Sequence, residues 1–269
     1  MSTTRMQITF ERDAPMAAAY PPATWDVHQP SDAWLLSPPG ISLWLYGSTV
    51  ASGSRLRWAG RHGDEAVYVL AGSLRVAGRH GDADVAAGGV VIVESAVSIE
   101  VLATADSRLL HFGATSSDPP MDGPYGAPIA DGHVAHAVGP AGIYAAAGEG
   151  RDTRFYADSS CPTCRITLMR TGRDGPYVSA PHSHSQDELI HVLTGQITLG
   201  RTALGPGDTI YVQAHRRYTF EGGPDGFSFL NYRPDASLHA VVRGGEPRLE
   251  GGAAHGFTHM ADAVDVSTS

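Results

Sequence analysis

Two histidines and a glutamate lie close together in the second half of the chain, within the segment PHSHSQDELIHVLTG of residues 181–195. His182 and His184 are separated by one residue, so in an extended strand both side chains point to the same face. Glu188 follows four residues later and keeps that phase. Two imidazole nitrogens and one carboxylate oxygen suit a borderline divalent metal and leave coordination positions open for water, dioxygen or substrate. The spacing therefore predicts an open metal site of the catalytic kind.

A polar, histidine-rich surface loop is the alternative interpretation of this segment. The residues that follow favour a β scaffold, because residues 189–193 form an apolar strand pattern and residues 196–200 form a second one. Thr194 and Gly195 between them predict a turn, and hence a hairpin. The tight turn LGPGD at residues 204–208 then precedes a third strand pattern, TIYV. The candidate ligands therefore belong to a β-rich unit.

The motif HxHxxxE, a glycine after six further residues and a PGD turn before an apolar strand together resemble the two motifs of the cupin superfamily. The resemblance implies a small jelly-roll barrel with a metal inside its mouth, held by His182, His184 and Glu188. The second cupin motif usually adds a histidine ligand, but here the sequence departs from it. Aligning the PGD turn places Tyr218 at that position and His215 three residues earlier, so the fourth ligand stays open between them. Tyr218 could instead donate a hydrogen bond to substrate or fill the barrel.

An internal repeat relates the two halves of the chain. Residues 65–72, EAVYVLAG, follow the pattern of residues 188–195, and the later strand patterns of the two halves also correspond. Many short strand patterns, 32 glycines and 18 prolines favour an all-β body rich in turns. We therefore predict an all-β fold of two tandem cupin jelly-roll barrels with few short helices. The predicted divisions are an N-terminal barrel at 1–118, a linker at 119–140, a metal-binding C-terminal barrel at 141–245 and a tail at 246–269.

The two copies differ in their candidate ligands. When Glu65 is aligned with Glu188, the other ligand positions of the first copy hold Ala59, Arg61 and Ile99. The first copy thus keeps only the carboxylate, which we expect to pair with Arg61. His62 is one position out of phase and is expected to point out of the barrel. The second barrel is therefore predicted to carry the function, with the first as its packing partner.

Cys161 and Cys164 form the only CxxC motif in the sequence. A redox role would need a βαβ context, and a metal role would need two further ligands, which are not evident nearby. Reduced thiols at the entrance to a strand are the expected state. His133 and His136 lie three residues apart, but their proline-rich surroundings do not favour a helix that would pair them.

Charge and composition narrow the classes of partner. The net charge is −9 and no basic stripe is present, so nucleic acid is not an expected partner. No apolar run reaches membrane-spanning length, and the sequence does not open on a signal-peptide pattern. These features predict a cytoplasmic protein that acts on a small molecule without a membrane partner. Exposed sheet edges in jelly rolls favour a homodimer, by analogy.

The predicted metal site allows several reactions. Resemblance to metal-containing two-domain cupins of the quercetin-dioxygenase-like kind implies a dioxygenase that cleaves a chelating, oxygenated substrate, with Fe(II) favoured and Zn, Ni, Mn or Cu as alternatives. Glu188 would then accept a substrate proton and Tyr218 would hold the developing oxyanion. A non-oxidative lyase, isomerase or decarboxylase is the first alternative. A non-catalytic small-molecule binding protein is the second.

Overall fold

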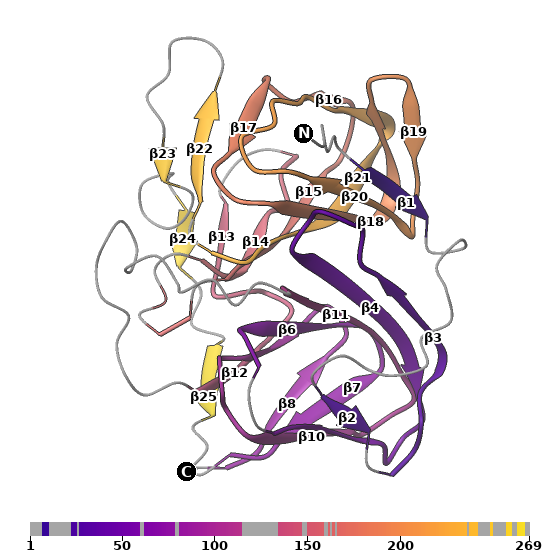
Figure 1. Ribbon diagram of the computed structural model, residues 1–269, viewed down its shortest axis with the longest axis vertical. Helices are drawn as coiled ribbons and strands as arrows, with labels where there is room; N and C mark the ends of the chain where they lie inside the picture. Colours follow the sequence, from indigo (N-terminus) through magenta and orange to yellow (C-terminus); the bar gives the residue numbers. More distant parts are fainter. Residues whose placement is uncertain are drawn as a thin grey trace.

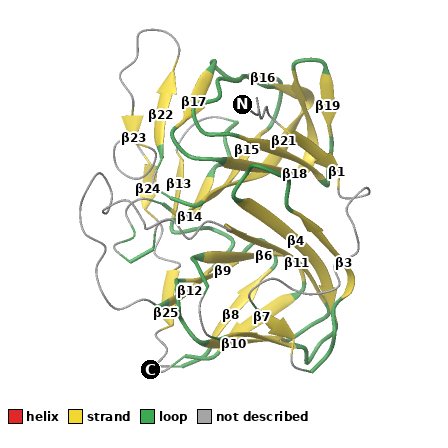
Figure 2. Ribbon diagram, in the orientation of Figure 1, coloured by secondary structure: helices red, strands yellow, loops and turns green. Residues whose placement is uncertain are grey.

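In the computed structural model, strands make up all the regular secondary structure of the described residues (Figure 2). The structure describes residues 7–10, 23–25, 27–59, 62–78, 81–114, 134–146, 150–158, 161, 163–164, 166–235, 237–241, 248–249, 257–259 and 263–266. The predicted all-β class is confirmed, although the few short helices expected from the sequence do not occur within these ranges. None of the described residues forms a helix able to cross a membrane.

The first barrel consists of two sheets that share one apolar core (Figure 1). The five-stranded sheet contains, in spatial order, β2 (Thr24–Trp25), β5 (Arg55–Trp58), β10 (Ile99–Ala103), β7 (Ser73–Val76) and β8 (Ala83–Ala86). The seven-stranded sheet contains β25 (Ala263–Val266), β12 (Ala135–Val138), β9 (Val90–Val93), β6 (Glu65–Ala71), β11 (Ser107–Ala114), β4 (Leu43–Val50) and β3 (Ser31–Leu36). Buried residues of both sheets, such as Leu74 and Val67, meet between them, as period-two alternation requires.

The second barrel repeats this plan with one large sheet and one small one. The large sheet contains, in spatial order, β1 (Gln7–Phe10), β20 (Asp208–Val212), β18 (Glu188–Leu199), β21 (Glu221–Arg233), β15 (Thr167–Arg173), β14 (Arg154–Ala157), β13 (Tyr144–Ala146) and β24 (Phe257–His259). Two short strands extend it, β16 (Tyr177–Val178) on β21 and β19 (Thr202–Leu204) on β18. The small sheet contains β17 (His182–His184), β22 (Leu238–Val241) and β23 (Arg248–Leu249).

The hairpin predicted around Thr194 and Gly195 is wrong. Residues 188–199 form the single strand β18. Its pairing with β21 continues through two register shifts, one before Gly195 and one after it. In the first barrel the equivalent Gly72 separates β6 from β7, which belong to different sheets. Both glycines have positive φ, +84° and +67°, and a side chain at either would collide with a backbone carbonyl oxygen. Thr194-Gly195 therefore marks a bulge within a strand, and Ala71-Gly72 marks a bend between two sheets. The sequence pattern suggests a turn at Thr194-Gly195.

The terminal strands cross between the barrels (Figure 1). The first strand, β1, pairs with β20 in the second barrel, and the last strand, β25, pairs with β12 in the first. Strand β12 also pairs with β9, although it lies in the range 119–140 that the sequence suggests is a linker. Strands β23, β24 and β25 lie in the range 246–269 that the sequence suggests is a tail. Each barrel is thus completed by a strand from the far end of the chain.

A continuous apolar core joins the two barrels. One cluster of buried side chains includes Leu45 and Phe112 from the first barrel and Leu168 and Tyr232 from the second. The rings of Phe112 and Tyr232 have centroids 5.5 Å apart, so the contact is direct. Burial of this shared surface fixes the orientation of the large sheet that carries the candidate site.

Candidate metal centre in the second barrel

Three histidines converge where the small sheet meets the barrel mouth. His182 and His184 alternate along β17, and both side chains face the interior, as their spacing predicts. Strand β22 pairs with β17 so that His239 lies directly opposite His184. One nitrogen from each of the three rings falls within a group whose members all lie within 4.8 Å of one another. The third imidazole therefore comes from a strand more than 50 residues away in the sequence.

The surroundings of His182 and His184 determine which nitrogen atoms are available to a metal. His182 Nδ1 lies 2.7 Å from the carbonyl oxygen of Ala180, and because a carbonyl only accepts, Nδ1 carries the proton and donates. His182 Nε2 is then the atom with a free lone pair. Burial, reinforced by the positive charge of Arg233, lowers the pKa of His184 to about 2. His184 is thus an unprotonated imidazole at neutral pH.

Glu188 lies beside the three histidines but is held by other groups. Its Oε1 accepts hydrogen bonds from Arg233 at 2.7 Å and from Asn231, and its Oε2 accepts one from the Tyr218 hydroxyl at 2.5 Å. The same Oε1 lies 3.5 Å from His184 Nε2. Burial alone would raise the pKa of Glu188, but the Arg233 charge and the hydrogen bonds from Tyr218 and Asn231 outweigh it and hold this pKa well below its ordinary value. Glu188 is therefore a buried carboxylate with a guanidinium partner.

The two candidates for a fourth ligand lie in different places. Tyr218 is buried and lines the same pocket as the histidines, and burial with the nearby Glu188 carboxylate raises its pKa well above the ordinary value. Its oxygen is thus a protonated phenol directed at Glu188. His215 is exposed in the turn before it, with φ of +61°, and only its backbone N–H reaches the site region, donating to the carbonyl of His184 at 2.6 Å. The structure brings Tyr218, and not His215, to the histidines.

The histidines form one wall of a cavity of about 190 Å³. Met169, Phe220 and Phe229 add apolar side chains to its lining. Two arginines, Arg151 and Arg173, lie opposite each other across a β-bridge at its edge. Burial and the neighbouring charge of Arg173 lower the pKa of Arg151, as expected for two like charges placed close together. An anion between them would relieve this repulsion.

Arg173 also lines this cavity. Its Nε is buried and has no hydrogen-bond partner among the described residues, and its guanidinium carbon lies 4.6 Å from the centre of the Tyr177 ring. Stacking on Tyr177 fixes the plane of the guanidinium group. The cavity thus combines an imidazole cluster with preorganised donors suited to a carboxylate.

The matching region of the first barrel differs from the sequence alignment by one residue. Trp58 pairs with Ile99 as His182 bridges to Tyr218, so Trp58, rather than Ala59, is the structural counterpart of His182. The expectation that His62 points outward is wrong: its side chain is buried, with Nδ1 4.0 Å from Glu65 Oε1. Arg61, the expected partner of Glu65, lies outside the described residues.

Sequence reasoning missed the two arginines at the cavity edge, Arg151 and Arg173, and two residues closer to the histidines. His239 follows the second cupin-like motif by some distance, and its only signal is a histidine within the apolar strand pattern LHAV. Arg233 ends strand β21 and is 1 % exposed, although arginine seldom occupies a core without a partner. A buried carboxylate at position 188 makes such a partner necessary, but sequence alone does not identify which arginine provides it.

Comparison with solved structures shows the fold. An oxalate decarboxylase from Bacillus subtilis, in work on its Mn(II) centres, matches with a TM-score of 0.60 and 15% identity over 90% of this chain and 81% of that one. A putative glyoxylate-induced protein from Pseudomonas aeruginosa matches with a TM-score of 0.60 and 15% identity over 86% and 90%. A cupin 2 conserved barrel domain protein from Leptotrichia buccalis matches with a TM-score of 0.51 and 12% identity over 82% and 92%.

These neighbours establish that both units have the jelly-roll architecture of cupin proteins. Neither a family model nor a curated protein sequence matches the chain. At identities of 12% to 15%, the similarity is one of fold, and the chemistry of this chain has to be argued from its own residues.

Proposed function

We propose that the protein is a metal-dependent enzyme that binds a small carboxylate-bearing molecule in the second barrel, and that its reaction is dioxygenation of a chelating substrate. The observation that supports this most directly is the convergence of three imidazoles on a cavity edged by two arginines. Neutral ligands leave the full charge of a divalent ion in the site, which favours an anionic chelating substrate.

The donor set fits a transition metal of the Fe(II) type. His182, His184 and His239 would hold it, with Zn, Ni, Mn or Cu as alternatives that the same ligands accept. When bound, such a metal would supply a Lewis acid and, if redox-active, a centre for dioxygen activation. Glu188 would act as a fourth ligand only by exchanging part of its contact with Arg233. We therefore assign the three histidines as the primary ligands.

The arginines would bind and orient the substrate. Arg173, with its plane fixed by Tyr177, would donate to one carboxylate oxygen, and Arg151 would contribute charge at the cavity edge. Charge-assisted hydrogen bonds of this kind contribute about 1.5–3 kcal/mol each. The aromatic wall formed by Phe220 and Phe229 would exclude water from the reacting end of the molecule.

Glu188 and Tyr218 would hold each other in position beside the histidines through their hydrogen bond. With its pKa held low, Glu188 is a weak proton acceptor, so its sequence-based role as general base is not favoured by its surroundings. Its carboxylate instead fixes the Arg233 guanidinium and the Tyr218 hydroxyl beside the histidines. Tyr218 would stabilise negative charge on a substrate only by turning its hydrogen bond away from Glu188.

A decarboxylase is the second candidate function. The basic edge of the cavity favours a carboxylate whether the substrate is oxidised or simply loses CO₂, and a structural neighbour is described as an oxalate decarboxylase. Oxygen demand separates the two reactions, because a decarboxylation without net oxidation of substrate consumes no dioxygen.

The experiment that tests the proposal measures dioxygen uptake and CO₂ release together. Protein loaded with Fe(II), Mn(II) or Zn(II) would be incubated with 2-oxo acids, hydroxybenzoates and dicarboxylic acids, with and without air. Substrate loss with equal oxygen uptake supports the dioxygenase. CO₂ release without oxygen uptake supports the decarboxylase instead, and ligand binding without turnover of any compound would favour a binding protein.

A matched pair of variants tests the substrate class. For Arg173→Met we expect KM for the best acid to rise by about 10- to 100-fold, with a smaller change in kcat, because a charge-assisted contact is lost. Arg217→Met serves as the control, since Arg217 is exposed and does not line the cavity. Equal effects of the two substitutions would contradict the assignment of Arg173.

The homodimer and the cytoplasmic location stay predictions. Sedimentation velocity of the purified chain at two concentrations would measure the oligomeric state.

A further inference from the structure

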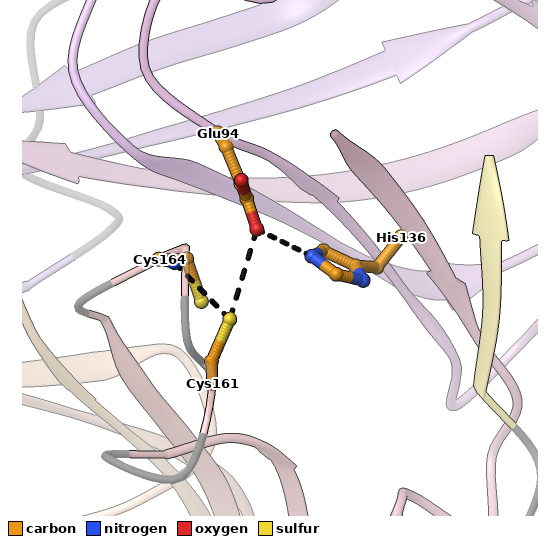
Figure 3. A group of neighbouring side chains, drawn as sticks. All are labelled: Glu94, His136, Cys161 and Cys164. Atoms are coloured by element: carbon orange, nitrogen blue, oxygen red, sulfur yellow. Dashed lines mark hydrogen bonds and ion pairs between the residues drawn. The ribbon is translucent and has the colours of Figure 1, made fainter. Parts of the chain in front are cut away.

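Four potential metal ligands, none of them part of the three-histidine centre, meet between the two barrels (Figure 3). Glu94 directly follows β9 and His136 lies on the neighbouring β12, so both come from the first barrel. Cys161 and Cys164 come from the segment that joins β14 to β15 in the second barrel. One ligand atom from each residue lies within 4.8 Å of every other. The arrangement thus supplies the two further ligands that a CxxC pair needs, from positions distant in sequence.

We propose that Glu94, His136, Cys161 and Cys164 bind one zinc ion that links the two barrels. Two thiolates, an imidazole and a carboxylate form a complete tetrahedral set for zinc, with Zn–S distances of about 2.3 Å and Zn–N and Zn–O distances of about 2.0–2.2 Å. Four protein ligands leave no position for substrate. The site is therefore structural, in contrast to the open three-histidine centre.

The Glu94 carboxylate is oriented for this role. Its Oε2 accepts a hydrogen bond from the backbone N–H of Val134 at 2.9 Å, which fixes the plane of the group. Its Oε1 faces the cluster, where it lies 2.6 Å from His136 Nε2 and accepts the Thr163 hydroxyl at 2.7 Å. Cys161 Sγ is 3.7 Å from the same oxygen. In the zinc-bound form the metal would take the place of the contact between Oε1 and the imidazole.

The CxxC loop is also preformed. The backbone N–H of Cys164 points at Cys161 Sγ, with a nitrogen-to-sulfur distance of 3.1 Å, and such a donor stabilises the negative charge of a thiolate. The backbone N–H of Cys161 donates to the carbonyl of Asp158 at 3.1 Å, which closes the turn. Both cysteines are free, so both sulfurs are available as ligands.

Burial adds to the case for a metal at this cluster. Glu94 is 0% exposed and Cys164 is 4% exposed, while His136 and Cys161 are half-buried. The buried Glu94 carboxylate pairs with His136, and a divalent cation would offset the desolvation cost of this carboxylate together with two thiolates. Because the ligands come from both barrels, ion binding would stabilise their association and, through β15, the wall that carries Arg173.

Metal counting in single-site variants tests the proposal. Full-length protein would be purified under reducing conditions, loaded with zinc, freed of excess metal and analysed for zinc per chain. The double variant Cys161→Ser, Cys164→Ser should lose about one equivalent of zinc per chain. The double variant His184→Ala, His239→Ala should keep that equivalent. Thr163→Ser is the matched control in the same loop and should keep this zinc. Equal zinc content in wild type and the cysteine variant, with both folded by circular dichroism, would overturn the proposal.

Cobalt spectroscopy tests the same site in the unmodified sequence, in case the cysteine variant fails to fold. Co(II) added to metal-free wild-type protein should give a sulfur-to-cobalt charge-transfer band in the near ultraviolet, and one equivalent of Zn(II) should abolish it. The band should persist in the His184→Ala, His239→Ala variant. Absence of the band in fully reduced protein would overturn the proposal. A Cys161–Cys164 disulfide that forms under the same reducing conditions even when zinc is present would also overturn the proposal. Neither readout depends on enzyme activity, so this site and the proposed function can fail separately.

Discussion

Glu65 and Glu188 occupy the same place in the two copies of the β unit but have opposite electrostatic surroundings. Both are almost fully buried, with exposed fractions of 2% and 0%. Glu188 accepts a hydrogen bond from the Arg233 guanidinium, which helps to keep it ionised. Glu65 contacts the indole N–H of Trp58 at 2.7 Å and His111 Nε2 at 2.6 Å, and burial raises its pKa to about 8. The same carboxylate position thus serves a charged site in one barrel and a neutral core in the other.

The first barrel also lacks counterparts of His182 and Arg233, because large aromatic rings occupy their places. In the repeat alignment Gly113 corresponds to Arg233, and the Trp44 ring lies where a side chain at Gly113 would project. Trp44 and Trp58 both pack edge-on against His111, with ring centroids 4.8 and 5.5 Å apart. Indole has therefore replaced both the imidazole and the guanidinium of the second barrel. Aromatic packing at these positions explains how the first copy keeps the β fold of the repeat without the imidazole and guanidinium groups of the second.

The largest expected effect is the loss of the metal from the second barrel alone. For His184→Ala combined with His239→Ala we expect complete loss of the metal bound at the three-histidine centre and of any activity, because two of its three ligands are removed. Glu65→Gln in the first barrel should leave metal content unchanged. Elemental analysis of both proteins, loaded and washed in the same way, measures the difference. Equal losses would show that the barrels are chemically equivalent.

Removal of the Arg233 cation should be the most destabilising single change. Arg233→Met leaves the Glu188 carboxylate buried without its guanidinium partner, which should reduce the free energy of unfolding by about 3–5 kcal/mol. Adding Glu188→Gln should restore part of the loss, since the buried charge is then gone. Urea unfolding of the single and double variants measures this coupling, with Arg217→Met as an exposed control. Additive effects in the double variant would rule out the pairing.

The neutral carboxyl of the first barrel should appear in the pH dependence of stability. With a folded pKa of about 8 against an ordinary value of 4.5, Glu65 binds more protons in the folded state, so its contribution is lost as pH rises towards 8. Burial lowers the pKa of His111 well below 6.5, and this opposes the Glu65 effect at pH values under 6.5. Between pH 6.5 and 8, Glu65 should therefore lower the free energy of unfolding by about 1–2 kcal/mol.

Glu65→Gln isolates this contribution, because glutamine keeps the hydrogen-bonding shape without the ionisation. Denaturant titration across pH 6.5 to 8 measures the free energy of unfolding of both proteins. As the pH rises, that of the wild type should fall relative to that of the variant. A constant difference over that range would mean that Glu65 is already ionised at pH 6.5.

The sequence predicts the fold better than it predicts the site, for physical reasons. Strand alternation and the glycine pattern are local signals, and they correctly predict two β units and place His182 and His184 on one face. His239 and Arg233 reach the site through strand pairing and burial, which are long-range properties. The hairpin at Gly195 was predicted wrongly because a positive φ suits a bulge as well as a turn. The cluster of Cys161 with Glu94 is likewise formed only when the barrels pack together.

The smallest expected effect concerns Tyr218, whose counterpart in the first barrel is the apolar Ile99. Tyr218→Phe keeps the ring but removes the hydrogen bond to Glu188, so the free energy of unfolding should fall by about 1 kcal/mol. Metal content should be unchanged, because the phenol is directed at the carboxylate and its raised pKa disfavours a phenolate ligand. Urea unfolding and elemental analysis of the same preparation measure both quantities. Loss of the metal with little change in stability would instead make Tyr218 the fourth ligand and would align this barrel with the usual four-ligand cupin pattern.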